Sequence, residues 1–506
     1  MVCSTGGDLP TGPATQLTDV SSTAVATAVH AALNMLLRAR PPLATLGSIG
    51  CLARVGRHCA AARRCMSSAT EADFVVIGAG PVGASTAWYL GEDEANEGKR
   101  IVLVHDPTDR GAHEDWSRLA RLSFDGPAEE MDLSRHAVSL LDLVDEVRSY
   151  QSGAPVVPIR PGMLFLASPG TAMAQTCAHG EAEYGDPDFV RRSVDELPDL
   201  YPGNSFELPA DTLCWTHPTG LCVSPIELAD CARNTAAAYG VEVEEGRAGL
   251  SIAPDGDLIR VTLSCGKTFD TPRAFLMAGA QSKQICAQAL AADPTLNADF
   301  AIPEFDETYI SAISTVRYAH RNHPASPAEG SGHVAQPITL GQLEIPDLIG
   351  FQANFSVVAE EMGDVYKTRL SGDIGTEVIE TVAGLHDPAL VANDGPMGEQ
   401  YGKFFGALFP HLQTEKALDF NRCVTYRNHN PAFSGTSLLE KPVGGADSTV
   451  LTTAGCFGVG VKFGPALGQA AAAHTSGQEL ERGMNVFRSG EMPMEEEGAE
   501  RVERAW

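Results

Sequence analysis

Residues 72–90 read ADFVVIGAGPVGASTAWYL, and this stretch decides the fold. It opens with the continuous apolar run of residues 74–77, which is typical of a buried parallel strand. Gly78, Gly80 and Gly83 follow at the G-x-G-x-x-G spacing, and apolar residues then recur at helical intervals. A strand, a glycine turn and a helix in this order give the context that a dinucleotide-binding fingerprint requires. The sequence therefore predicts a dinucleotide site, with an ordinary strand-to-helix turn as the alternative.

Each glycine of this turn has a separate physical task. Gly78 permits the tight turn, Gly80 lets a pyrophosphate approach the backbone, and Gly83 lets the helix pack closely on the strand. The helix begins at Pro81, and the free N–H groups of its first turn, from Val82 onward, face the phosphates together with its positive dipole end.

A second strand is expected over residues 100–104, RIVLV. In this fold an acidic side chain at the end of the second strand accepts hydrogen bonds from the ribose hydroxyls. His105 holds the usual position of that acid, whereas Asp106, one residue later, has the appropriate chemistry. The sequence leaves the choice between the two residues open.

Composition argues against several classes of function. The chain has 506 residues, 43% hydrophobic and 20% charged, so a folded body of about two or three domains is expected. Its formal net charge of −29 argues against nucleic acid as a partner, because a phosphate backbone needs a basic face. No run of 18 apolar residues occurs, so no transmembrane segment is expected. The twelve cysteines include no C-x-x-C pair, and no metal site is indicated.

The N-terminal segment, residues 1–70, has a composition of its own. Residues 20–70 contain six arginines and no acidic residue. Such a composition is typical of an organelle transit peptide. We expect a mitochondrial presequence that ends near residues 65–68, and hence a protein of the mitochondrial matrix. A plastid address and an untargeted tail are the alternatives.

Beyond the first unit, strand and helix patterns predict a doubly wound sheet that is interrupted twice. Arg118 and Arg121 are three residues apart and would share one face if their segment were helical. Helices are expected over residues 133–147 and 225–239, and strands over residues 161–167, 213–223, 273–279, 422–426 and 450–453. The strand at residues 422–426 is expected to return to the first domain. A second glycine-rich turn within residues 455–472 leads into the last helix.

Five of these places together resemble the sarcosine-oxidase-like amine oxidases, within the larger D-amino-acid-oxidase group of flavoproteins. They are GAGPVG at residues 78–83, GAHEDWSRLARL at 111–122, Thr219-Gly220, LMAGAQSKQI at 276–285, and GVGVKF at 458–463. The last is the most specific, and the resemblance covers roughly residues 72–480.

The resemblance implies an α/β fold (α+β overall): a Rossmann-type FAD-binding domain interrupted by a mainly antiparallel β substrate domain. The FAD-binding domain would comprise residues 72–155, 216–295 and 415–480, and the substrate domain residues 156–215 and 300–412. Residues 1–70 would form the disordered presequence and residues 485–506 an acidic tail.

The implied cofactor is FAD rather than NAD, because NAD alone would leave the second glycine turn without a role. Some relatives bond the flavin covalently through a cysteine, and Cys423 resembles that cysteine in placement, with an inert buried thiol as the alternative. The candidate cofactor-binding residues are Gly78, Gly80, Pro81, Val82, Gly83, Asp106, Ser117, Arg118, Gly279, Cys423, Gly458, Gly460 and Lys462.

The resemblance also implies catalytic residues. Arg121 and Lys462 match an arginine and a lysine that clamp the substrate carboxylate, although a surface ion pair is the alternative for Arg121. Lys367 is the candidate for a lysine that promotes the reaction of reduced flavin with oxygen, where a cation stabilises developing negative charge. An ordinary strand lysine is the alternative for Lys367.

The expected function is oxidation of the C–N bond of a secondary or N-substituted amino acid, such as sarcosine, to an imine. Electrons would pass to O2 or to an electron-transfer flavoprotein. One alternative is a mitochondrial flavoprotein that acts mainly as an assembly factor of a respiratory complex, with turnover secondary. An NAD-dependent dehydrogenase is a further alternative.

Overall fold

The structure is a computed structural model. It describes residues 69–107, 118–124, 128–252, 258–292, 305, 308–319, 337–345, 353–359, 365–371, 376–380, 394–428, 438–443, 445–453, 455 and 460–476. All these residues belong to one compact unit, Arg64–Trp506. The residues of the predicted presequence that precede residue 69, and the predicted acidic tail, lie outside the described residues.

The first sheet is doubly wound and has six strands among the described residues. Its order is β20 (Leu438–Val443), β21 (Gly445–Thr453), β13 (Arg273–Leu276), β2 (Phe74–Ile77), β3 (Ile101–His105) and β9 (Glu242–Glu245). Every neighbouring pair is parallel except β20 with β21 at the edge. Strand β2 is buried over its whole length, as its apolar run predicts for a central strand covered on both faces.

The order of the strands reverses beside β2. From β2 the chain passes through helix α3 (Pro81–Glu92) to β3 on one side, whereas β13 on the other side comes much later in the sequence, after the first excursion. Loops beyond the carboxyl ends of strands at such a switch point form the usual ligand crevice of an open α/β sheet. The glycine turn therefore lies at the position where this fold binds its ligands.

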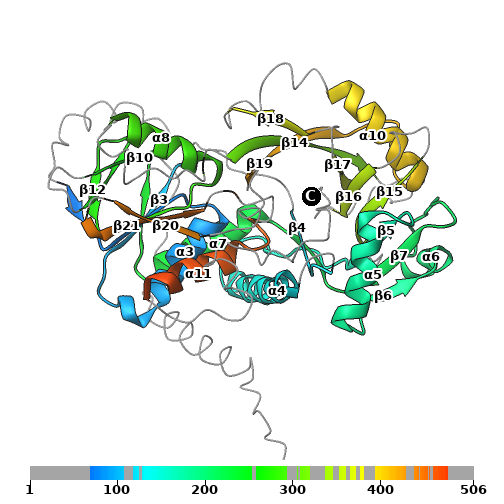
Figure 1. The fold of residues 1–506 in the computed structure, drawn as a ribbon, viewed down its shortest axis with the longest axis horizontal. Coiled ribbons are helices and arrows are strands. Elements are labelled where there is room, and N and C mark those ends of the chain that lie inside the picture. Colours follow the sequence, from blue (N-terminus) through cyan, green and yellow to red (C-terminus); the bar gives the residue numbers. More distant parts are fainter. Residues whose placement is uncertain are drawn as a thin grey trace, which may run out of the picture. The chain divides into compact units, whose positions relative to one another are not determined.

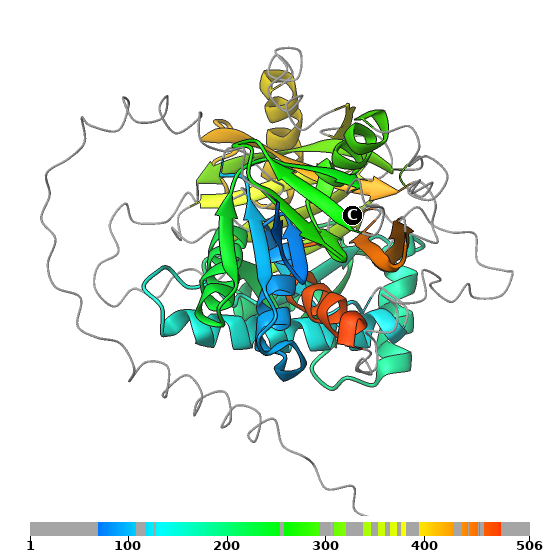
Figure 2. The ribbon, with the colours of Figure 1, turned by 90° about the vertical axis from the view of Figure 1, so that its left-hand side faces the viewer.

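One face of this sheet is covered by helices. They are α3, α4 (Ala128–Ser149), α7 (Pro225–Ala238) and α11 (Gly464–Ser476). Figures 1 and 2 show α3 and α11 side by side, although they lie near opposite ends of the described sequence. Their contact is close because Gly464 and Gly468 of α11 face Pro81 and Ser85 of α3.

The opposite face carries a smaller sheet and helix α8 (Ser282–Ala292). The small sheet has the order β1 (Thr70–Glu71), β12 (Thr268–Thr271), β11 (Ile259–Leu263) and β10 (Ala248–Ile252). Val75 and Ile77 of β2 pack in this cluster, so the central strand is covered on both faces.

The second large sheet has nine strands among the described residues. Along its main path these are β18 (Thr376–Ile379), β14 (Thr308–Ala319), β17 (Val365–Ser371), β16 (Ala353–Ala359), β15 (Ile338–Leu343), β5 (Met163–Ala167), β7 (Leu213–His217) and β6 (Val190–Arg192), and β19 (Asp419–Asn428) pairs with β14. Only β15 with β5 is parallel among the described pairs of this sheet. A Rossmann-type sheet joined to a mainly antiparallel one confirms the predicted fold class.

Two helices bury opposite faces of the nine-stranded sheet. Aromatic residues of α10 (Asp394–Leu408) pack with Leu164 and Leu166 of β5, together with the short helix α6 (Leu197–Leu200). Helix α5 (Ala172–Tyr184) packs instead with Met163 and Phe165 of the same strand. The alternation along β5 follows from the two-residue period of a strand.

Strand β19 corrects one expectation. Residues 422–426 were expected to return to the first domain, but β19 pairs with β14 along Thr308–Arg317 in the nine-stranded sheet. Among its described side chains, that of Tyr426 packs in the hydrophobic cluster of the six-stranded sheet. Cross-strand hydrogen bonds cannot be read from the sequence, so a single apolar strand gave no sign of its partner. The predicted domain boundaries themselves stay a prediction.

Two local features differ from the simplest reading of the sequence. The helical condition for Arg118 and Arg121 is not met, because they lie in strand β4 (Arg118–Arg121), which pairs antiparallel with β8 (Gly220–Val223). The strand expected over residues 213–223 is divided into β7 and β8. The backbone N–H of Thr219 donates to His217 Nδ1 at 2.9 Å and so closes a turn between them.

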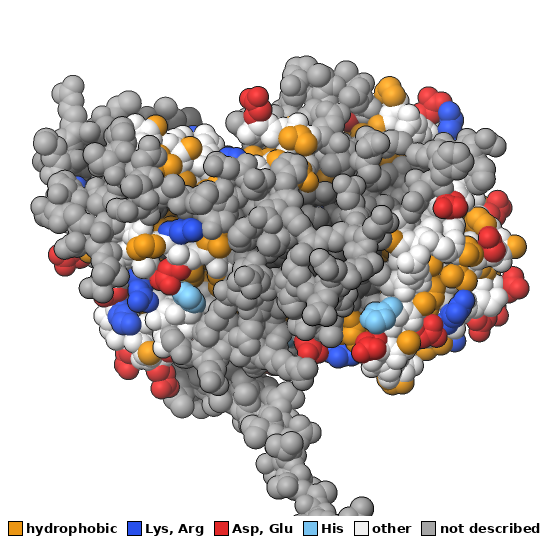
Figure 3. Space-filling view, viewed as in Figure 1, with side chains coloured by type: hydrophobic (Ala, Val, Ile, Leu, Met, Phe, Trp, Pro, Cys, Tyr) orange, Lys and Arg blue, Asp and Glu red, His pale blue; other side chains and the backbone are white. Residues whose placement is uncertain are grey.

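Charged side chains on the described surface are mixed in sign. Figure 3 shows basic and acidic groups interspersed with hydrophobic ones on one face of the molecule. Exposed pairs such as Arg160 with Asp142, 2.7 Å apart, contribute only about 0–1 kcal/mol each. None of the helices in the described part of the chain has the length and apolar character needed to cross a bilayer.

The contact between α3 and α11 gives a first prediction. A Cβ at Gly468 would lie 2.6 Å from Ser85 Cβ and 2.7 Å from the Thr86 backbone nitrogen. We expect Gly468→Ala to destabilise the protein by about 1–3 kcal/mol, because overpacking outweighs the gain in helix propensity. The measurement is the midpoint of urea unfolding. Gly395→Ala is the matched control, since a Cβ at this helical glycine meets nothing within 4 Å; equal midpoints for the two variants would contradict the expectation.

Candidate functional site

The glycine turn has the strained and close geometry that only glycine allows. Gly78 has φ +103°, and a Cβ there would lie 2.6 Å from the carbonyl oxygen of Met277. A Cβ on Gly83 would lie 1.8 Å from the Gly78 carbonyl oxygen, so the helix rests directly on the turn. Gly80 is the N-cap of α3, and Pro81 follows at the first helical position, where its missing N–H costs nothing.

Two later segments meet this turn. Gly279, at φ +56°, begins a 3-10 turn after β13, and the preceding Ala278 lies against Gly78. At the other side, a Cβ on Gly464 would lie 3.0 Å from Pro81 Cβ. Gly460 and Lys462 belong to the turn that leads into Gly464. The structure therefore brings together candidate residues from three segments of the sequence.

Lys462 is buried, with 6% of its surface exposed. Its Nζ donates a hydrogen bond to Ser123 Oγ at 2.8 Å and lies 4.5 Å from the centre of the Phe463 ring. This hydrogen bond joins the C-terminal turn to the segment that follows β4. A buried ammonium needs such partners because its desolvation is costly.

Arg121 is also buried, at 8% exposure. It ends β4 opposite Gly220, and a Cβ on Gly220 would lie 2.3 Å from the carbonyl oxygen of Gly162. The guanidinium donates to the Leu122 carbonyl at 3.1 Å and lies 5.5 Å from the centre of the Phe165 ring. The alternative of a surface ion pair for Arg121 does not fit this burial. The hydrogen bond from Lys462 reaches the chain two residues further on, at Ser123.

His105 and Asp106, the two candidates for contact with the ribose, both lie at the end of β3. The strand ends at His105, whose imidazole pKa is lowered by burial and by the nearby Arg233. Asp106 follows directly, and its carboxylate lies 3.8 Å from Nε of Arg247. Which of the two meets a ribose stays a prediction.

Several candidates are only partly described. Ser117 and Gly458 lie outside the described residues. For Cys423 and Lys367 the structure gives the backbone alone: Cys423 pairs with Ile313 of β14, and Lys367 of β17 pairs with Arg317 of the same strand. Arg118 begins β4 and is half-buried, and Val82 is half-buried in the first turn of α3. The roles assigned to these residues stay predictions.

One residue of the site was missed. Ser123 is 1% exposed and accepts the Lys462 hydrogen bond. A strand assignment for residues 118–121 could have found it, because positions 121 and 123 share one face of an extended chain.

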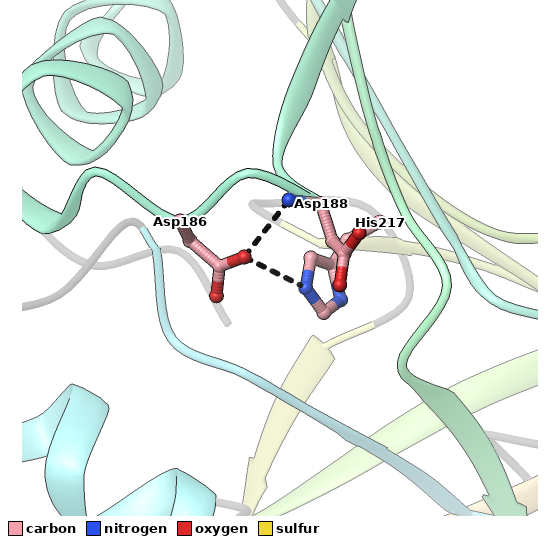
Figure 4. A group of neighbouring side chains, drawn as sticks. All are labelled: Asp186, Asp188 and His217. Atoms are coloured by element: carbon pink, nitrogen blue, oxygen red, sulfur yellow. Dashed lines mark hydrogen bonds and ion pairs between the residues drawn. The ribbon is translucent and has the colours of Figure 1, made fainter.

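A separate cluster contains Asp186, Asp188 and His217, whose ligand-type atoms lie within 4.8 Å of one another (Figure 4). Asp186 Oδ1 accepts the Asp188 backbone N–H at 3.0 Å and lies 3.7 Å from His217 Nε2. His217 Nδ1 accepts the Thr219 N–H, so the ring proton of a neutral imidazole must be on Nε2, facing Asp186. A metal ligand needs a lone pair on that nitrogen, so the geometry favours a carboxylate that faces the histidine N–H over a metal site.

The family follows from comparison with known proteins. The chain matches the family described as DAO, FAD dependent oxidoreductase, over residues 73–474. It therefore belongs to this family and is a FAD-dependent oxidoreductase. No curated protein matches the chain.

Solved structures share the fold at low sequence identity. NikD, an unusual amino acid oxidase essential for nikkomycin biosynthesis, has a TM-score of 0.61 at 15% identity, over 84% of this chain and 99% of NikD. Glycine oxidase from Geobacillus kaustophilus has a TM-score of 0.58 at 14% identity, over 83% and 98%. Iminodiacetate oxidase from Chelativorans sp. BNC1 has a TM-score of 0.58 at 17% identity, over 82% and 98%.

The residues present fit FAD. The glycine turn packs backbone against backbone at Gly78 and Gly83, and the N-terminus of α3 has no side-chain cap, so N–H groups of its first turn are available to a phosphate. Gly279 and the turn at residues 460–463 extend the site on either side. The pyrophosphate would be held at Gly78–Gly83, and Lys462 lies in the segment expected to adjoin the flavin ring.

Substitution of Gly78 tests this cradle. We expect Gly78→Ala to weaken FAD binding by roughly 10- to 100-fold, because about 1–3 kcal/mol of strain falls on the turn itself. The measurement is the flavin-to-protein absorbance ratio of the purified protein, followed by FAD titration of the apoprotein. Gly98→Ala is the matched control, since Gly98 also has positive φ but a Cβ there meets nothing within 4 Å. Full FAD retention by Gly78→Ala would count against the site.

His217 gives a pH prediction. Burial lowers its imidazole pKa, against the opposing effect of Asp186 and Asp188, so the folded state favours the neutral ring. The unfolded state then binds more protons, and stability falls as pH drops below about 6.5, the ordinary histidine pKa. Asparagine at 217 keeps an acceptor for Thr219 but cannot be protonated. We expect His217→Asn to show a smaller loss of unfolding free energy between pH 7 and 5 than the wild type; identical slopes would refute the assignment.

Proposed function

We propose that this FAD-dependent oxidoreductase oxidises the C–N bond of a secondary or N-substituted amino acid, such as sarcosine, to an imine. The observations that carry the proposal are the burial of two cations, Arg121 and Lys462, and the hydrogen bond that Lys462 makes to Ser123, two residues after Arg121. Arg121 ends β4, and Lys462 is bonded to Ser123 shortly after that strand. The two side chains come from segments that lie far apart in the sequence, one near the start of the described chain and one near its end.

A buried guanidinium and a buried ammonium are suited to a carboxylate. Charge-assisted hydrogen bonds are roughly twice as strong as neutral ones, and a partly dry site strengthens the attraction further. Bound FAD supplies the two-electron acceptor. The chain's residues would hold the carboxylate, orient the amine and exclude water. An amino acid with its carboxylate so fixed presents the adjacent C–H and amine in one orientation.

The names of the structural neighbours support an amino-acid substrate. Glycine oxidase, iminodiacetate oxidase and an amino acid oxidase share the fold, and glycine and iminodiacetate both combine an amine with a carboxylate. The preference for a secondary amine comes from the family resemblance in the sequence and is part of the proposal.

The electron acceptor and the location belong to the proposal too. The Arg-rich, acid-free composition of residues 20–70 supports a mitochondrial matrix location, testable by the localisation of a fluorescent fusion with residues 1–70. O2 and an electron-transfer flavoprotein are the two candidate acceptors, and Lys367 supports O2. Peroxide release during turnover distinguishes them. Covalent attachment through Cys423 predicts that flavin stays with acid-precipitated protein and is released from Cys423→Ser.

The cation pair gives a direct test by substitution. We expect Arg121→Met and Lys462→Met each to lower kcat/KM by roughly 100-fold, because each removes a charged hydrogen bond to the carboxylate. The measurement is anaerobic bleaching of flavin absorbance by sarcosine, dimethylglycine, pipecolate and proline, corrected for flavin content. Lys403→Met is the control, since Lys403 is an exposed lysine paired with Glu399 on α10.

If both site variants turn over amines like the wild type, the clamp is wrong. A protein that binds FAD but bleaches with none of the amines would instead fit the assembly-factor alternative.

A further inference from the structure

Ser123 makes two buried hydrogen bonds, one through its hydroxyl and one through its backbone N–H. Lys462 Nζ donates to Ser123 Oγ at 2.8 Å, and the Ser123 backbone N–H donates to Ser134 Oγ at 3.1 Å. The Ser134 hydroxyl in turn donates to the Met131 carbonyl at 2.8 Å. Ser123 and Ser134 are 1% and 0% exposed. The ammonium is thus linked through two serines to the backbone of α4.

Hydrogen bonds of this kind restrict the position of a lysine ammonium. A lysine side chain has a flexible four-carbon stem and about 2 kcal/mol of rotamer entropy, so its ammonium is poorly fixed by its own backbone. Burial raises the cost of any arrangement that leaves N–H donors without acceptors. The Ser123 hydroxyl, on the segment that follows β4, is an acceptor that helps to fix the position of Nζ.

That position is tied to Arg121. The Ser123 acceptor follows Arg121 closely in the chain, and β4 is held by its pairing with β8 up to Gly220. The hydrogen bond from Lys462 to Ser123 therefore fixes the ammonium relative to the segment that carries Arg121. A hydroxyl is a neutral acceptor, so it orients the lysine without cancelling its charge.

We propose that Ser123 is a positioning residue, which holds the Lys462 ammonium in place to receive the substrate carboxylate. The proposal rests on the proposed function, because it assigns Ser123 a role through the carboxylate clamp. Ser134 supports it by holding the Ser123 backbone.

The test uses the full FAD-loaded protein and acetate as the carboxylate probe. Acetate binding is followed by the change in flavin absorbance, with acetamide as the uncharged probe of the same shape. We expect Ser123→Ala to raise the Kd for acetate roughly 5- to 20-fold and to leave that for acetamide unchanged, because only the charged interaction is lost. Ser123→Thr, which keeps the hydroxyl, is expected to restore acetate binding.

Two further variants serve as a control and as a second test. Ser85→Ala is the matched control, since Ser85 is a buried serine whose hydroxyl has no partner among the described residues; its Kd for acetate should equal that of the wild type. Ser134→Ala should raise the acetate Kd in the same direction as Ser123→Ala, and it serves if Ser123→Ala does not fold.

The outcomes separate this inference from the proposed function. One outcome is that Lys462→Met binds acetate weakly while Ser123→Ala and Ser134→Ala bind it normally. This result overturns the positioning role and leaves the clamp intact. Normal acetate binding by Lys462→Met, or no acetate response in the wild type, overturns the clamp itself. Equal weakening for acetate and acetamide in Ser123→Ala shows general damage and overturns the role of Ser123.

Discussion

The close backbone contact at Gly78 is the constraint on which the rest of the structure depends. The Gly78 backbone meets Met277 and Ala278 after β13 on one side and Gly83 of α3 on the other, and no side chain can occupy either space. The contact joins the first βα unit to a strand that comes much later in the sequence. Through Pro81 and Gly464 it also joins α3 to α11. One point of close packing therefore fixes both the sheet order and the site for the cofactor.

Two long insertions interrupt the part of the chain that forms the six-stranded sheet. They build the nine-stranded sheet, and β19 binds that sheet by its hydrogen bonds while Tyr426 packs with the six-stranded one. The segment from Arg121 to Ser123 joins the two parts differently: Arg121 lies over Phe165 of β5, and Ser123 accepts from Lys462. The charged groups assigned to substrate binding thus lie where the parts of the chain that carry the six-stranded and the nine-stranded sheets meet.

The sequence predicts the first part of this account well and the second part poorly. The run at residues 72–90 is locally determined, since strand, turn and helix each follow from their own residues, and the fold class is confirmed. Arg118 and Arg121 were compatible with a helix because a three-residue spacing fits one helix face; only the pairing with Gly220 makes their segment a strand. Ser123 was missed for the same reason. The partners of β19 and the Asp186–His217 pair depend on contacts between distant segments, which no local pattern records.

The central claim is that Arg121 and Lys462 bind a carboxylate that lies next to an oxidisable amine. It is tested most directly by anaerobic titration of the FAD-loaded protein with amino acids and their matched amides, such as sarcosine and sarcosinamide, or proline and prolinamide. We expect that at least one acid bleaches the flavin absorbance and that its amide does so at least roughly 100-fold less efficiently, because the amide lacks the charge that the buried cations bind. Equal bleaching by acid and amide would contradict it.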